Sequence, residues 1–136
     1  AMTKLSTDRE ILEAIYAEYA AAYRQMQLDD SGSAQKIYVP INIPRIAKKL
    51  KNDAHILFGR LYYHLDQKHR YKQDDGSSVH LFAFQVGNER HCINYPYLAA
   101  ILAQHRDDQA SNRLNFWLAV AALVLSLLSL VAQMAS

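Results

Sequence analysis

Residues 43–65 read IPRIAKKLKNDAHILFGRLYYHL, with two runs of apolar residues at helical spacing and a short polar break, KND, between them. The first run places its apolar residues on one helix face: Ile43, Ile46, Ala47 and Leu50. The second run does the same with Leu57, Leu61 and Leu65. Asn42 can cap the first helix and Pro44 fits its first turn. The stretch therefore predicts two helices, 43–51 and 54–69, joined by a tight turn.

The segments on either side predict one more helix before this pair and a small sheet after it. Thr7 and Glu10 have the spacing of a capping box, and apolar residues recur at helical spacing over the next 16 positions, 11–26. Residues 37–43 contain Pro40 and predict an edge strand at most. Asp74-Asp75-Gly76 and Gly87-Asn88 are turn signals that separate strand-like runs, and a further helix is expected from Pro96.

These elements predict an α+β fold that is mostly helical, with a small antiparallel sheet and a C-terminal hydrophobic helix. Residues 1–36 form an N-terminal helix and loop, and 37–106 form the main domain. Residues 107–113 are polar and predict a hinge, and 114–136 form the apolar tail.

The order helix, short strand, helix, turn, helix, hairpin resembles that of winged helix-turn-helix domains. Residues 43–84 carry the resemblance: Ala47 is the small residue where two helices approach closely, and 60–71, followed by a hairpin that contains glycine, resemble the exit into the wing. The resemblance covers about 37–106. It implies a DNA-binding transcription regulator whose recognition helix, 54–69, enters the major groove. It equally allows a protein-interaction module, since winged helices serve both purposes.

Charge is concentrated in the same region. Residues 44–73 contain eight basic and two acidic side chains, a net +6, although the whole chain carries only +2. A basic block of this kind suits double-stranded DNA, whose phosphates bind Lys and Arg in a salt-dependent way. The candidate DNA-binding residues are Arg45, Lys48, Lys49, Lys51, Asn52, His55, Arg60, Tyr63, Gln67, Lys68, Arg70 and Lys72.

Two features favour a protein partner instead. The start of the predicted recognition helix is poor in charge, and the expected wing tip, Asp74-Asp75, would repel phosphate. A membrane-tethered adaptor would dock its partner at Ile56, Gly59 and Tyr63.

No pattern of catalytic or metal-binding residues is found. The six histidines lack the i, i+4 spacing of a helical metal site, Cys92 has no CxxC partner, and the four glycines are scattered. We expect a binding protein with no enzymatic activity, no metal and no cofactor.

Residues 114–136 contain no charged side chain, and about 20 apolar residues suffice to cross a bilayer as a helix. Arg106 and Arg113 precede the segment and no basic residue follows it, so the positive-inside preference keeps the domain in the cytoplasm, anchored to the inner membrane by a single span. Small residues recur on one stripe and predict a helix-association face in a homodimer: Ala119, Ala122, Ser126 and Ser129. The alternative is a helix of a soluble oligomer.

Overall fold

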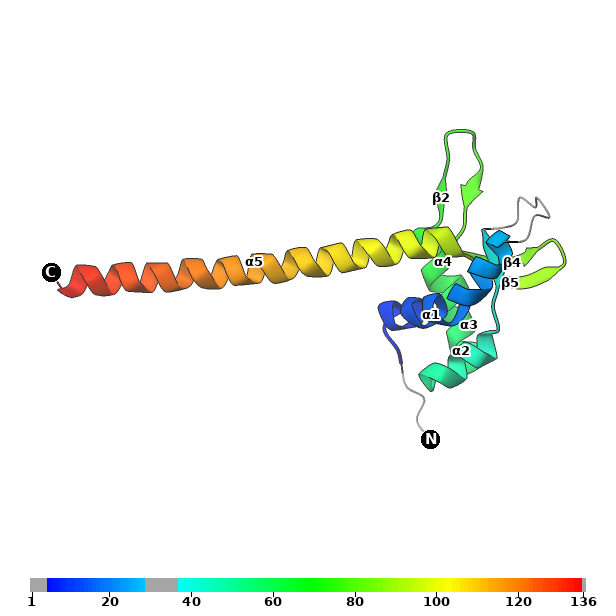
Figure 1. Cartoon of the computed structure of the whole chain (residues 1–136), viewed down its shortest axis with the longest axis horizontal. Coiled ribbons are helices and arrows are strands. Elements are labelled where there is room, and N and C mark those ends of the chain that lie inside the picture. Colours follow the sequence, from blue (N-terminus) through cyan, green and yellow to red (C-terminus); the bar gives the residue numbers. More distant parts are fainter. Residues whose placement is uncertain (1–4, 29–36, 136) are drawn as a thin grey trace. The chain divides into compact units, whose positions relative to one another are not determined.

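The structure is a computed structural model that describes residues 5–28 and 37–135. Its elements are α1 (Asp8–Leu28), β1 (Tyr38–Pro40), α2 (Ile43–Leu50), α3 (Ala54–Gly59), the π-helical η1 (Arg60–Leu65), α4 (Asp66–His69), β2 (Tyr71–Lys72), β3 (Ser78–Val79), β4 (Phe82–Val86), β5 (Glu89–Asn94) and α5 (Tyr95–Ala135). The chain divides into two compact units, one up to Leu102 and one from Ala103 onward. The expected mostly helical fold with a small antiparallel sheet and a long apolar C-terminal helix is confirmed (Figure 1).

Side chains fix the starts of the first helices as the sequence predicts. The Thr7 hydroxyl accepts from the Glu10 amide, and the Glu10 carboxylate accepts from the Thr7 amide, both at 3.1 Å, which is a complete capping box. Asn42 caps α2 by accepting from the Arg45 amide at 3.0 Å. Asp53 caps α3 by accepting from two backbone amides, so the turn between the two helices is closed by local hydrogen bonds.

Segments α3, η1 and α4 follow one another without a break and are called the motif helix below, residues 54–69. Leu57, Leu61 and Leu65 are all buried, as expected from their spacing. Four residues of an α-helix overshoot a full turn by about 40°. The wider π turn at η1 compensates for that drift, so the three leucines stay in line with the core.

The hydrophobic core of the first unit combines α1, α2, the motif helix, the sheet and the start of α5. Its buried members extend from Ile11 to Leu102 and include Leu57, Phe82 and Ile93. All of the core cluster therefore lies ahead of residue 103.

The hairpins differ from the expectation. β1, β5 and β4 form a three-stranded antiparallel sheet in that order, while β2 and β3 pair only with each other. The expected single strand through 79–84 is interrupted, because the amides of Leu81 and Phe82 donate to the Asp66 carboxylate. Figure 1 shows the two hairpins as separate ribbons, and the one joined to β1 is the second, with Gly87-Asn88 at its tip.

Residues 107–113, expected to form a hinge, are helical and belong to α5. They contain neither glycine nor proline, so nothing in them interrupts the backbone hydrogen bonds of a helix. Among the described residues, α5 is the one helix that is long and apolar enough to cross a membrane, by length and composition. None of its most apolar window is buried in the structure.

Candidate nucleic-acid interface

The motif helix presents three surfaces besides its buried leucines: one faces the start of α1, one faces the β4–β5 hairpin, and one is exposed. The predicted DNA-binding residues are distributed over these surfaces unequally. Only side chains that are exposed, or that can exchange a partner within the fold, can contact a ligand.

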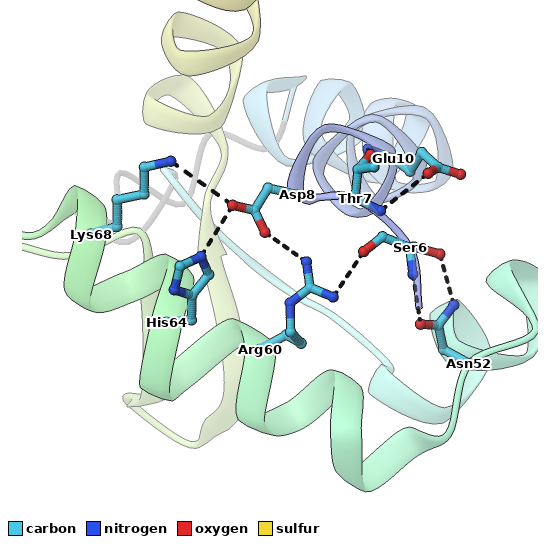
Figure 2. Close-up of polar contacts among 8 residues, drawn as sticks. All are labelled: Ser6, Thr7, Asp8, Glu10, Asn52, Arg60, His64 and Lys68. Atoms are coloured by element: carbon cyan, nitrogen blue, oxygen red, sulfur yellow. Dashed lines mark hydrogen bonds and ion pairs between the residues drawn. The ribbon is translucent and has the colours of Figure 1, made fainter. Parts of the chain in front are cut away.

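The surface toward α1 carries Arg60, His64 and Lys68, which all point to Asp8 (Figure 2). The Asp8 carboxylate lies 2.7 Å from the Arg60 guanidinium, 3.2 Å from the His64 ring and 3.9 Å from the Lys68 amine. Partial burial raises the pKa of Asp8, but the bonds to Arg60 and His64 outweigh it and hold the pKa below its ordinary value of 3.8.

Ser6 adds to this contact. Its carbonyl oxygen accepts from the Arg60 guanidinium at 2.8 Å, and its hydroxyl accepts from the Asn52 side-chain amide at 2.8 Å (Figure 2). Arg60 and Asn52, both expected to face DNA, therefore bond to the segment ahead of α1. Asp8 and Ser6 were missed by the sequence reasoning, since the capping box around Thr7 indicates a helix start and says nothing of a partner 52 residues away.

The exposed surface of the motif helix carries no Lys, Arg, Asp or Glu side chain. His55 and Gln67 are exposed, Ile56 is 43% exposed and Tyr63 is 77% exposed. Gly59 lies between them and presents no side chain. We call this surface the exposed strip. It consists of five residues that the sequence analysis predicted to contact DNA or a protein partner: His55, Ile56, Gly59, Tyr63 and Gln67.

Apart from Arg60 and Lys68, the basic residues of the block fall into two groups. Arg45 and Lys49 bind the Glu18 carboxylate of α1 at 2.8 and 3.4 Å, and Arg70 binds Asp66 at 2.7 Å. A second group is exposed and has no ion-pair partner among the described residues: Lys48, Lys51 and Lys72. Lys51 has a left-handed backbone (φ 60°) and ends α2, so it stands at the turn into the motif helix.

Asp66 fixes the end of the motif helix against the sheet. It is only 2% exposed and accepts from the amides of Leu81 and Phe82 at 2.9 and 3.1 Å. Its second oxygen binds Arg70 at 2.7 Å and lies 3.4 Å from the His80 ring. Sequence reasoning gave this aspartate no role, because its partners lie up to 16 residues away.

The surface toward the hairpin is aromatic. The rings of Phe58, Tyr62 and Phe84 surround His91 with centroid distances of 5.2–5.9 Å. The Tyr62 hydroxyl lies 3.1 Å from His91 Nδ1, and burial raises the pKa of Tyr62 to about 12. His91 itself has a left-handed backbone, φ 55°, at the centre of β5. These contacts hold the hairpin beside the motif helix.

The remaining features are the possible metal ligands, the cysteine and the small residues of α5. Within residues 5–28 and 37–135, no group of three His, Cys, Asp or Glu side chains is placed to hold a metal ion. Cys92 is buried, and its burial raises the pKa of the thiol. In the second unit, Ala119, Ala122, Ser126 and Ser129 are all exposed on α5, as are its leucines.

Comparisons of the chain with protein families, with curated proteins and with solved structures find no match.

Proposed function

We propose that this chain is a membrane-anchored DNA-binding protein of the winged helix-turn-helix class, acting in transcription regulation. The order α1–β1–α2–motif helix–hairpin supports the class, and so does the sheet order β1-β5-β4, in which the last strand lies between the other two. In this reading the wing is the β4–β5 hairpin, and the acidic β2–β3 ribbon is an addition to the domain.

The exposed strip of the motif helix carries the proposal. Its His55, Tyr63 and Gln67 side chains can donate and accept hydrogen bonds, which is how base edges are read in the major groove. Gly59 between them permits close approach, and Ile56 can contact a thymine methyl group. Lys48, Lys51 and Lys72, which bind no acidic side chain in the described part of the chain, would contact phosphates.

The C-terminal helix would hold this domain at the cytoplasmic face of the inner membrane. Residues 114–136 lack charge, and Arg106 and Arg113 precede them, which favours a cytoplasmic position for the domain. The small-residue stripe from Ala119 to Ser129 would let two such helices pair and bring two domains to one DNA site.

A duplex-binding measurement tests the DNA proposal. The fragment 1–108 retains the entire core cluster, which ends at Leu102, and its binding to a labelled duplex can be followed by fluorescence anisotropy. Replacing Lys48 and Lys51 with glutamine should flatten the plot of log K against log salt by about 1.8, or about 0.9 per lost phosphate contact.

The matched control removes two positive charges from α1 through Arg9→Gln with Arg24→Gln, and it should leave the slope nearly unchanged. Absence of binding at about 50 mM salt, where phosphate contacts are strongest, would refute the DNA proposal.

A second function is favoured by the exposure of Ile56 and Tyr63: an adaptor that docks a protein through this strip. A charge at the centre of such an interface is strongly unfavourable. Ile56→Glu should then abolish capture of a partner by the full-length chain in membranes, whereas the double lysine variant should not. If the double lysine variant lost capture of the partner and Ile56→Glu retained it, the adaptor function would be refuted.

A further inference from the structure

The contact between the start of α1 and the motif helix has an unusual charge balance. Arg60, His64 and Lys68 are four residues apart and converge on the single carboxylate of Asp8 (Figure 2). Two of the three are cationic at neutral pH whatever the state of the histidine, so one negative charge faces at least two positive ones. An anion with more charge or more oxygen atoms would match this surface better than one carboxylate does.

Phosphate is such an anion. The guanidinium of arginine binds carboxylate and phosphate oxygens with the same paired hydrogen-bond geometry. Arg60 already donates to two acceptors here, the Asp8 carboxylate at 2.7 Å and the Ser6 carbonyl at 2.8 Å. Two acceptors side by side on one guanidinium resemble the two oxygens of a bound phosphate.

Residues 5–8, which cover these basic side chains, are held to the motif helix by few contacts. Asp8 is the first residue of α1, and the helix is anchored further along by Ile11, Leu12 and Ile15, which are fully buried. His64 and Lys68 keep 54% of their side chains exposed, so their pairs with Asp8 contribute little to stability. Of residues 5–8 only Ser6 is buried, at 3% exposed, and it is not a member of the hydrophobic core cluster. Displacing these residues from the motif helix would therefore expose Ser6 but leave that cluster closed.

We propose that Asp8 and Ser6 occupy a phosphate-binding position on the motif helix, so that residues 5–8 and a DNA backbone phosphate compete for Arg60, His64 and Lys68. This inference rests on the proposed function and specifies its regulation. DNA binding displaces the segment, and the segment weakens binding whenever it is docked.

Asp8→Asn in the full-length chain, kept in non-ionic detergent, is the direct test. With the competing charge removed, duplex affinity at about 50 mM salt should rise about tenfold, while the salt slope should stay nearly the same, because bound DNA displaces residues 5–8 and makes the same phosphate contacts in both proteins. Glu13→Gln is the matched control, because it removes one negative charge from the same helix at a side chain that pairs with Arg9. It should raise affinity much less.

Combining Asp8→Asn with Arg60→Gln should abolish most of the gain, since Arg60 makes the shortest contact. Asp8→Ser serves as a second variant if Asp8→Asn lowers the melting temperature. Unchanged or weaker duplex binding in folded Asp8→Asn, or the same gain with Glu13→Gln, would overturn the competition.

Inorganic phosphate separates this inference from the DNA proposal. Against chloride of equal ionic strength, phosphate should raise the melting temperature of Asp8→Asn more than that of Glu13→Gln. If phosphate stabilises Asp8→Asn but no variant binds duplex, the phosphate position is retained and the DNA function fails. If duplex binds but phosphate has no selective effect and affinity is unchanged, the DNA function is retained and the phosphate position fails.

Discussion

Replacing Asp66 by alanine tests whether a buried carboxylate holds the motif helix to the sheet. Asp66 is 2% exposed, and its carboxylate accepts from the amides of Leu81 and Phe82, which are themselves buried. Alanine would leave both amides without a partner and without access to water. An unsatisfied buried donor costs about 1–3 kcal/mol. Two of them predict a loss of about 4 kcal/mol in the free energy of unfolding.

The other two partners add little to this figure. The side chains of Arg70 and His80 are 39% and 37% exposed, so water replaces Asp66 around them. Asp66→Asn retains an oxygen that can accept from both amides and loses only the charge. It should therefore cost about 1–2 kcal/mol.

Urea denaturation of fragment 1–108, followed by circular dichroism, measures these losses. Asp74→Ala is the control, because Asp74 is an exposed aspartate in the turn between β2 and β3 and should change stability by less than about 0.5 kcal/mol. The reasoning would be refuted if Asp66→Ala lost less than about 1 kcal/mol, or if asparagine were as damaging as alanine.

The same carboxylate predicts a pH dependence. Burial raises the pKa of Asp66, but the bonds from Arg70, the Phe82 amide and His80 outweigh it and hold the pKa below the ordinary 3.8. Because the folded-state pKa is the lower one, the stabilisation is present above about pH 4 and is lost as the pH falls further. The stability difference between wild type and Asp66→Asn should shrink over that acid range in the same urea assay.

Three further outcomes follow from single features. Leu61→Ala should lower the free energy of unfolding by about 2–5 kcal/mol in urea, since Leu61 is 1% exposed. Gly76→Ala should weaken the β2–β3 hairpin by about 1 kcal/mol, seen as faster amide exchange there, because Gly76 has a φ of 88°, which a residue with a Cβ adopts only with strain. No neighbour lies within 4 Å of an added Cβ, so this cost comes from the backbone alone. Burial raises the pKa of Tyr62 and Tyr95 to about 12, so both phenols should ionise late in an absorbance titration. Their contribution to stability should be complete below pH 10 and lost between pH 10 and about 12, the sign expected for a raised pKa.

The helices were predictable because their signals are local. The capping box at Thr7, the cap at Asn42 and the leucine stripe of the motif helix each involve residues no more than four positions apart. Such contacts form in the same way wherever the helix lies in the fold. The hinge expected at 107–113 is helical instead, because a run of polar residues indicates only that a segment is exposed. An exposed helix can be as polar as a loop.

The candidate interface was only partly predictable. Exposure of Ile56, Tyr63 and Gln67 followed from their positions opposite the leucine stripe. The pairing of Arg60 with Asp8 could not be predicted, because the sequence around an arginine on a helix surface does not indicate which distant segment will pack beside it. The same holds for Asn52 and Ser6.

The sequence by itself determined where most helices begin and end, which faces they bury, and that the chain ends in an uncharged segment long enough to cross a membrane. Tertiary structure alone decided which hairpin joins β1, which aspartate is buried at the end of the motif helix, and which basic side chains remain free for a ligand. The physical reason is range. Helical periodicity arises between neighbours three or four residues apart, whereas strand pairing and ion pairing depend on distant segments whose backbone and charged groups are chemically alike until packing selects among them.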